Sequence, residues 1–191
     1  MAVSTGPGSF TGLRVGLSVA KGLASGRGLA LIGIPTLDGL AQTFAQEPCS
    51  PPSNAIWTVL EAGRKRYAAT LYQIDNGRAR RVLDHRVGNA EFVAEQIQEL
   101  LNQTPESAPT DQPVQIGRML VCGDLDASLR STLVARLRDR IMFPNNAQNV
   151  RRAAYLAELA WVRWQANDLD DVETLAPFYL PTPSLPQERA A

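Results

Sequence analysis

A glycine-rich loop close to the amino terminus constrains this chain more than any other feature. Residues 6–14 read Gly-Pro-Gly-Ser-Phe-Thr-Gly-Leu-Arg, and a short apolar segment, Ala2–Ser4, precedes them. The pattern predicts a strand, a tight turn at Gly6 and Gly8, and then a helix over about Leu13–Ala24. A turn of this kind normally follows a complete strand inside a sheet, so we expect the chain to enter its fold in the middle of a domain.

The loop allows two interpretations. Gly6, Gly8, Ser9 and Thr11 form a candidate anion or nucleotide loop, because the N–H groups at a helix start attract negative charge. The spacing departs from the known phosphate templates, since Leu-Arg follows the last glycine and Thr11 stands where the dinucleotide fingerprint has glycine. A plain strand-to-helix turn that needs small residues is the other interpretation.

Small residues recur every four positions along the predicted helix, at Gly12, Gly16, Ala20 and Ala24. Glycine inside a helix costs about 1 kcal/mol relative to alanine. That cost is usually tolerated where another backbone approaches closely. Arg14 and Lys21 argue against a membrane helix pair. The stripe therefore predicts either a helix–helix contact, internal or between chains, or tight packing of the helix on its own sheet.

Composition limits the classes of function. The 191 residues carry 19 Lys plus Arg and 19 Asp plus Glu, so no overall charge attracts the chain to nucleic acid or to an anionic membrane. Cys49 and Cys122 lie far apart and form no Cys-x-x-Cys pair, which predicts two free thiols in a reducing compartment. With no signal-peptide pattern and no long uncharged apolar run, we expect a cytoplasmic protein.

Residues 1–46 read as a strand, a helix, a second strand at Gly28–Pro35 and a second helix at Leu37–Gln46, and a proline-rich linker at 47–54 follows. Residues 55–180 read as three strands, the third at Arg80–Asp84, followed by alternating helices and strands that end in a helix at about Gln148–Ala166. A loose tail is expected at 181–191.

The order of elements in residues 55–180 is typical of a ribonuclease-H-like lobe, a unit that occurs twice in the actin-like, or ASKHA, superfamily. Residues 1–46 match only the back half of such a lobe. We therefore expect an α/β, actin-like fold of two lobes, in which the amino-terminal lobe is incomplete because its first meander is missing. Its strands would then be short of neighbours, which is a liability at a sheet edge.

The glycine loop, continued through Ala20–Ala24, Gly33–Pro35 and Leu37–Ala41, resembles the signature region of the TsaB (YeaZ) family, once described as M22 glycoprotease-like. Three further segments resemble motifs of that family in the same order: Val59–Tyr67, Val121–Asp124 and Leu175–Leu180. The first strands of the family have no counterpart, so the resemblance implies an amino-terminal truncation. Glu61 stands where the family has aspartate.

The resemblance implies a role in forming threonylcarbamoyladenosine in tRNA. It implies a non-catalytic scaffold that binds the paralogue TsaD, which holds the metal and transfers the threonylcarbamoyl group, while the ATPase TsaE joins them. Contact with tRNA would be indirect, and a homodimer would use the same surface as the heterodimer. No cofactor is expected on this chain itself, although ATP or ADP at the shared interface stays open.

The pairing surface of the family lies largely on the two helices of the amino-terminal lobe. The corresponding helices here give a predicted partner interface at Gly12, Leu13, Gly16, Leu17, Ala20, Ala24, Leu40 and Phe44.

An enzyme is the alternative, either a metal-dependent peptidase or a sugar-kinase-like ATPase. The resemblance assigns a pair of histidines to the metal site of the catalytic paralogue, but this chain has one histidine, His85, so no metal or catalytic residue is expected. We expect His85 to be an exposed strand-end residue and Asp124 to cap the helix that follows it. The basic residues between Arg64 and Arg86 read as solvated strand faces rather than as an RNA surface.

Overall fold

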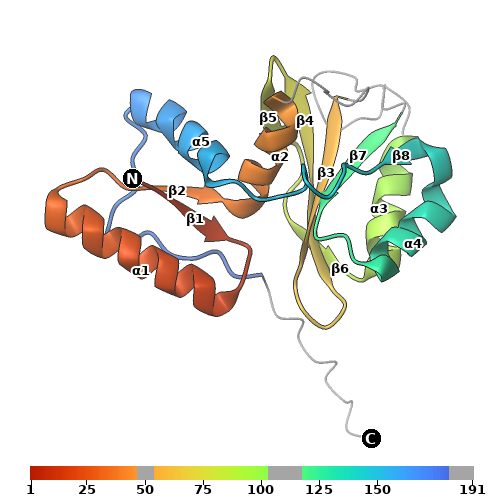
Figure 1. Ribbon diagram of the computed structural model, residues 1–191, viewed down its shortest axis with the longest axis horizontal. Helices are drawn as coiled ribbons and strands as arrows, with labels where there is room; N and C mark the ends of the chain where they lie inside the picture. Colours follow the sequence, from red (N-terminus) through yellow and green to blue (C-terminus); the bar gives the residue numbers. More distant parts are fainter. Residues whose placement is uncertain (47–53, 103–117, 181–191) are drawn as a thin grey trace, which may run out of the picture.

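The computed structural model describes residues 1–46, 54–102 and 118–180. The predicted tail lies outside these ranges, as do the predicted linker up to residue 53 and Cys49. Two sheets organise the chain, one of two strands and one of six (Figure 1). They lie side by side, and helices cover both faces of each.

The smaller sheet pairs β1 (Ala2–Gly6) with β2 (Ile32–Pro35) in parallel, with Ala2 opposite Ile32 and Ser4 opposite Ile34. The connecting helix α1 (Phe10–Arg27) is longer than the sequence predicted. It begins early because the hydroxyl of Ser9 accepts a hydrogen bond from the Gly12 N–H at 3.3 Å. It ends at Gly28, whose left-handed backbone (φ 63°) favours glycine.

The larger sheet has the strand order β5-β4-β3-β7-β8, and the short β6 also pairs with β4. Its strands are β3 (Ala55–Glu61), β4 (Tyr67–Asp75), β5 (Arg78–Arg81), β6 (Arg86–Gly88), β7 (Met119–Gly123) and β8 (Ile141–Met142). The first strands form an antiparallel meander, and β3 then pairs with β7 in parallel. This is the order of a ribonuclease-H-like lobe, so the predicted α/β, actin-like class is confirmed. The strand predicted at Arg80–Asp84 overlaps the end of β5 alone, because β5 ends at Arg81 and the separate short strand β6 begins at Arg86.

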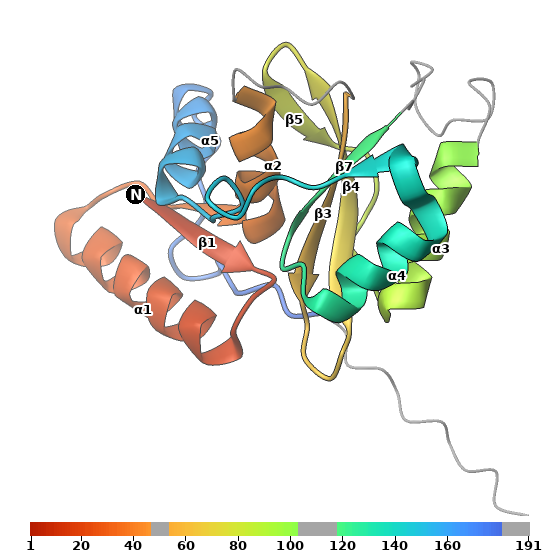
Figure 2. The ribbon, with the colours of Figure 1, turned by 45° about the vertical axis from the view of Figure 1, so that its right-hand side comes forward.

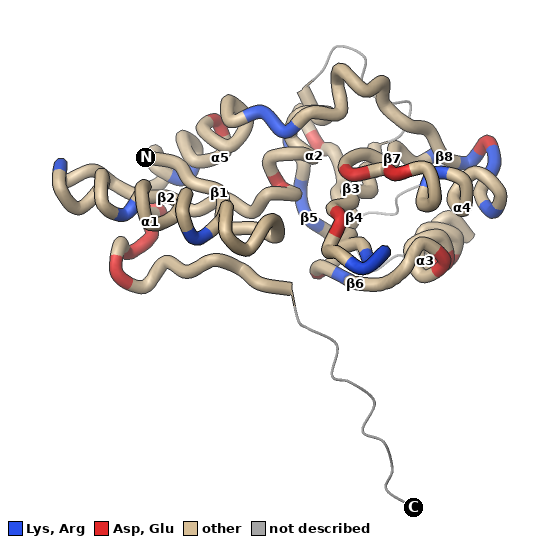
Figure 3. Tube along the Cα trace, turned by 60° about the horizontal axis from the view of Figure 1, so that its bottom comes forward, with Lys and Arg blue, Asp and Glu red and all other residues tan. Residues whose placement is uncertain are grey.

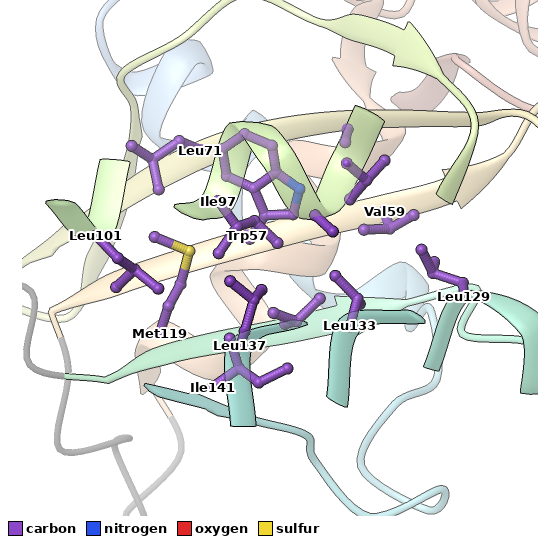
Figure 4. Close-up of a cluster of buried hydrophobic side chains, with 14 of the residues drawn as sticks. Trp57, Val59, Leu71, Ile97, Leu101, Met119, Leu129, Leu133, Leu137 and Ile141 are labelled. Carbon is purple, nitrogen blue, oxygen red and sulfur yellow. The ribbon is translucent and has the colours of Figure 1, made fainter. Parts of the chain in front are cut away.

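The central strand β3 is buried on both faces, which is why its sequence is a continuous apolar run. Its alternate residues serve different cores. Trp57 and Val59 pack beneath α3 (Ala90–Asn102) and α4 (Ala127–Leu137), the helices on one face (Figures 2 and 4). A short 3₁₀ turn, Arg138–Arg140, leads from α4 into β8. On the opposite face, Ile56 and Leu60 pack against α2 (Thr36–Gln46).

The last helix, α5 (Ala153–Gln165), packs on the smaller sheet and on α2, whereas the sequence assigned it to the second lobe. The reason is the exposed apolar face that β2 would otherwise present: Ile32 and Ile34 are covered by Ala160. α5 also fits closely against α2, since a Cβ on Gly39 would lie 2.6 Å from the Leu156 side chain. The remaining domain boundaries stay a prediction.

The segment after α5 runs back along the smaller sheet without forming a regular strand. The Phe178 N–H donates to the Thr5 carbonyl at 2.7 Å. Asp170 accepts from the Gly33 N–H at 2.7 Å, and Lys21 Nζ donates to the Glu173 carbonyl at 2.9 Å. The carboxyl-terminal residues therefore complete the first lobe rather than the second.

Asp38 of α2 ties that helix to the larger sheet. Arg81 Nη2 donates to both of its carboxylate oxygens, at 2.7 and 2.8 Å, and the Tyr72 hydroxyl donates to Oδ1 at 2.5 Å. Burial, together with the negative charge of Asp38, raises the pKa of Tyr72 far above its usual value. The Arg81 and Asp38 side chains are 31% and 26% exposed, so this ion pair is shielded more than a surface pair.

Replacing Asp38→Asn tests this tie. The amide keeps the size of the side chain but removes the charge that pairs with Arg81, so we expect the free energy of unfolding to fall by about 1–3 kcal/mol. Urea denaturation followed by circular dichroism measures it. The matched control, Asp75→Asn at the exposed end of β4, should change stability by less than about 0.5 kcal/mol. Equal effects of the two changes would contradict the assigned role of Asp38.

Candidate functional site

The glycine loop joins β1 to α1, and the packing of the chain itself requires a glycine at the first position of this loop. Gly6 has φ 109°, and a Cβ there would lie 2.7 Å from the Phe178 carbonyl oxygen. Glycine is therefore required because the carboxyl-terminal segment crosses this point. Ser9 caps α1. Of the four predicted loop residues, Gly8 and Ser9 line cavities, whereas Gly6 packs against Phe178. Thr11 is exposed on the first turn of α1.

A cavity of about 480 Å³ lies between the loop and the larger sheet. The start of α1 forms one wall, the β3–β4 turn with Arg66 forms another, and the segment Phe178–Leu180 closes it. Its volume lies within the range of small-molecule pockets. The first turn of α1 carries no acidic residue, so the positive end of the helix dipole is not offset by its own side chains.

Arg66 adds a second positive group at this cavity. Its Nη1 is buried and has no hydrogen-bond partner, which is costly for a charged donor. The cavity wall also includes Glu61, whose side chain is exposed, so the electrostatics are mixed. The candidate anion loop thus stays a prediction, with Gly8, Ser9 and Arg66 as the residues that the structure brings together.

Asp124 does not cap the helix that follows it, contrary to our expectation; Asp126 does. The Asp126 carboxylate accepts from the Leu129 N–H at 2.7 Å and from the Tyr67 hydroxyl at 2.7 Å. Asp124 instead accepts from the Glu61 N–H at 3.2 Å and pairs with Arg151 at 3.2 Å. It therefore joins β3, the turn after β7 and the approach to α5.

His85 is half-buried rather than exposed, which corrects the expectation from sequence. Its ring packs against Phe178 with 5.2 Å between ring centroids, and its Nε2 is buried without a hydrogen-bond partner. Burial, reinforced by the positive charge of Arg81, lowers the pKa of His85. The contact with the carboxyl-terminal segment is what removes this side chain from solvent. Among the described residues, no cluster of three or more His, Cys, Asp or Glu has the geometry of a metal site.

Most of the predicted partner interface is buried inside the chain. Six of its eight residues form part of the core: Leu13, Leu17, Ala20, Ala24, Leu40 and Phe44. Ala20 and Ala24 pack against Leu31 on the smaller sheet, while Leu40 and Phe44 pack against the larger one. These six residues are unavailable to a partner, so their assignment to the surface is wrong. For Ala20 and Ala24 the error arose because a four-residue repeat drifts around a helix of 3.6 residues per turn, which carries these two residues away from the side of Gly12 and Gly16.

The outward face of α1 is nevertheless apolar. Val15, Val19 and Leu23 are 59%, 56% and 45% exposed, and Gly12 and Gly16 lie exposed beside them. We call these five residues the α1 face. Sequence reasoning missed its three large members, although they too recur every four positions. No helix within the described ranges is long and apolar enough to span a bilayer.

The glycines of α1 are not demanded by the packing of the chain itself. A Cβ built on Gly16, Gly22 or Gly26 would meet nothing within 4 Å. Because each glycine costs about 1 kcal/mol relative to alanine in a helix, α1 carries a stability penalty that its own fold does not explain. A second backbone that packs closely on this side would explain it.

Charges are spread over the molecule, with positive and negative residues interspersed along the trace (Figure 3). Two members of the basic group at 64–86 have partners inside the chain, since Arg81 binds Asp38 and Arg80 Nη2 donates to Gln73 at 3.0 Å. At the start of α1, Arg14 lies over the Phe10 ring at 3.9 Å and its Nε donates to the Tyr179 hydroxyl at 2.9 Å. This contact holds the carboxyl-terminal segment against the helix.

Comparison with known proteins relates this chain to proteins of tRNA threonylcarbamoyladenosine biosynthesis. The family model for TsaD, tRNA N6-adenosine threonylcarbamoyltransferase, matches residues 1–191. A 42-residue segment, 22% of this chain, is 52% identical to the tRNA threonylcarbamoyladenosine biosynthesis protein TsaB of Escherichia coli (strain K12) and covers 18% of that protein. A 126-residue segment, 65% of this chain, is 33% identical to tRNA N6-adenosine threonylcarbamoyltransferase of Geobacter sp. (strain M21) and covers 34% of it.

Solved structures share the fold. The structure of a Pseudomonas aeruginosa protein with similarity to the peptidase YeaZ superposes with a TM-score of 0.68 at 22% identity, covering 93% of this chain and 71% of that one. YeaZ from Pseudomonas aeruginosa gives a TM-score of 0.66 at 19% identity, covering 93% and 72%. The chain therefore spans only part of the proteins that it matches. It covers about a fifth of the TsaB protein and about a third of the transferase. It covers about seven-tenths of each of the two solved chains.

The cap at Asp126 predicts a dependence of stability on pH. The Leu129 N–H and the Tyr67 hydroxyl bind the carboxylate and lower the pKa of Asp126 in the folded state. The resulting stability is present above the unfolded pKa, about 3.9, and is lost as pH falls through the lower folded value.

We therefore compare the wild type with Asp126→Ala by urea denaturation between pH 7 and 2.5. The wild-type advantage, about 1 kcal/mol near neutral pH, should shrink below about pH 4. Tyr67→Phe should weaken the pH dependence, since it removes one of the two donors. Parallel curves over the whole range would show that Asp126 is not the cap.

Proposed function

This chain belongs to the tRNA N6-adenosine threonylcarbamoyltransferase family, in its TsaB/YeaZ branch, and from this membership we propose that it is a non-catalytic subunit in the biosynthesis of threonylcarbamoyladenosine in tRNA. Its partner in this proposal is a TsaD-like paralogue that carries out the transfer. The observation that carries the proposal is the exposed, apolar α1 face with its close-approach glycines.

The α1 face has the chemistry of a helix-pairing surface. Val15, Val19 and Leu23 supply apolar area, and Gly12 and Gly16 leave room for a second helix to approach closely. The five residues carry no charge, so a partner of either sign can cover them without burying an unpaired ion. A TsaD-like paralogue would therefore dock an apolar helix here.

Two features favour a scaffold over an enzyme. The chain has one histidine, so it cannot supply the two-histidine metal set that the resemblance assigns to the catalytic paralogue. That histidine packs against Phe178 and faces no cluster of acids or thiols in the described part of the chain. We assign the metal and the transfer step to the partner, the energy-coupling step to a TsaE-like ATPase, and contact with tRNA to the assembled complex in the cytoplasm.

Substitutions at Gly16 separate folding from partner binding. Gly16→Ala fills open space, so it should raise the unfolding free energy of the isolated chain by about 1 kcal/mol while weakening the complex. Gly16→Leu should leave the chain folded and abolish co-purification with the TsaD-like paralogue of the same genome. Val134→Asp, an exposed apolar position on α4, is the matched control and should bind normally. Wild-type affinity in Gly16→Leu would rule out the α1 face.

A second candidate function is the binding of a small anion, such as the phosphates of ADP, in the cavity between the lobes. Arg66 Nη1 is buried without a partner at the wall of that cavity, and the uncompensated start of α1 faces the same space. A phosphate there would meet both positive groups. In this proposal the nucleotide binds where the glycine loop meets the β3–β4 turn.

Isothermal titration with ADP, on the chain alone and with its TsaD-like partner, tests this second function. Arg66→Gln should weaken ADP binding at least tenfold, because a charge-assisted hydrogen bond contributes about 1.5–3 kcal/mol. Arg64→Gln, in the same turn but exposed, should change the affinity little. Absence of ADP binding by the wild type in both forms would reject the site.

A further inference from the structure

The carboxyl-terminal segment changes its character at Leu175. Up to this residue the segment is anchored, since Val172 and Leu175 pack against the core of the smaller sheet. Beyond it, residues 176–180 run past the start of α1 to the junction of the two lobes (Figure 1), and Phe178 and Tyr179 are 44% and 40% exposed. We call residues 176–180 the cover, because three of them line the cavity of about 480 Å³.

Few directed contacts hold the cover within the described ranges. On the smaller lobe, the Phe178 N–H donates to the Thr5 carbonyl at 2.7 Å, and the Tyr179 hydroxyl accepts from Arg14 at 2.9 Å. On the larger lobe, the Phe178 ring packs against His85 with 5.2 Å between ring centroids. A segment held in this way opens locally at a free-energy cost well below that of global unfolding.

Unpartnered polar groups gather beside the cover. Three buried side-chain nitrogen atoms in the described part of the chain lack a hydrogen-bond partner, and two of them are Arg66 Nη1 and His85 Nε2. Arg66 lines the cavity together with Phe178, and His85 packs against the same ring. Opening of the cover would admit water to both groups. The closed position therefore carries a polar cost, which the apolar contacts of the cover must outweigh.

The surroundings of His85 oppose a proton on its ring. Burial is the largest cause that lowers the pKa of His85, and the positive charge of Arg81 on β5 lowers it further. Asp38 on α2 and Asp84 beside His85 act in the opposite direction. Asp38 is bound to Arg81, and Tyr72 of β4, which also binds Asp38, stays neutral because its pKa is raised. The five residues of the cover include no acid and no base.

We propose that the cover is a movable gate of the cavity, latched shut while His85 is uncharged and released when His85 takes up a proton. A neutral ring nitrogen without a partner costs less than an imidazolium buried beside Arg81. In the open position the ring of His85 meets water, so its protonation favours opening. This device goes beyond the proposed function, because it requires neither the TsaD-like paralogue nor ADP.

Nuclear magnetic resonance of the full chain tests the latch. His85 is the only histidine of the sequence, so its ring resonance is identified without ambiguity, and we expect it to titrate below about 6.5, the ordinary value. Hydrogen exchange gives the protection factor of the Phe178 amide. Between pH 7.5 and 5 this factor should fall by up to about tenfold for each unit by which the pKa of His85 lies below 6.5. The amides of β3 are the internal reference for folding and should keep their protection.

Two substitutions separate the ring from the proton. His85→Phe keeps an aromatic ring against Phe178 but cannot be charged, so protection of the Phe178 amide should be the same at both pH values. His85→Ala removes the ring, so this protection should be at least tenfold lower at pH 7.5. Phenylglyoxal should then label Arg66 faster in His85→Ala than in the wild type at pH 7.5, while the exposed Arg64 should react equally in both. Mass spectrometry measures the labelling.

Three results would overturn the proposal. One is a His85 that titrates above 6.5, as a cation–π contact with Phe178 would cause. Another is a Phe178 amide whose protection depends on pH as strongly in His85→Phe as in the wild type. The third is an Arg66 that reacts equally fast in His85→Ala and in the wild type, which would show that the cover does not close the cavity. Co-purification with the paralogue and ADP binding are measured separately, so their failure leaves this test intact.

Discussion

The packing of α2 between the two sheets is the constraint on which the rest of the structure depends. One side of this helix fills the core of the larger sheet, while Gly39 admits Leu156 of α5 on the other. β2 ends at Pro35 and α2 begins at Thr36, so no flexible connection separates the small sheet from the helix. Once Asp38 has bound Arg81, the direction of β2 relative to the larger sheet is set.

This arrangement also determines which surfaces remain available. α5 and α2 cover one face of the small sheet. α1 covers the other face, where its Ala24 packs against Leu31. The outer side of α1 is then remote from every other core of the chain. The loop before α1 is brought opposite the β3–β4 turn, which creates the cavity that Arg66 lines. The exposure of the α1 face and the position of the cavity therefore both follow from the packing of α2.

Local patterns predicted the elements well where periodicity and turn residues agreed. The order of the larger sheet followed from the meander and the alternation after it, since β3 and β7 are apolar runs bounded by turn signals. The position of α5 did not follow, because its contacts with Ile32 and Ile34 join residues more than 120 positions apart and leave no local trace. The same holds for His85, whose burial depends on Phe178.

The α1 face illustrates a different limit of prediction from sequence. Sequence identified the right helix and two of its glycines but chose the buried side for the rest. On a helix of this kind both sides carry apolar residues, so Leu17 and Val19 are equivalent as sequence letters. Only the position of the sheet distinguishes them: Leu17 is 4% exposed and Val19 is 56% exposed. A helix that is apolar on two sides predicts two contacts, but it does not say which is internal.

The return of the carboxyl-terminal segment to β1 has a consequence for synthesis. Thr5, Gly33 and Lys21 obtain their partners from residues 170–178, so the first lobe to leave the ribosome is among the last parts to be completed. The larger sheet can close earlier, because its strands lie within residues 55–142. During translation the nascent chain must therefore carry an unfinished β1–β2 pair for most of its length, and chaperones that recognise bare strands would meet it there.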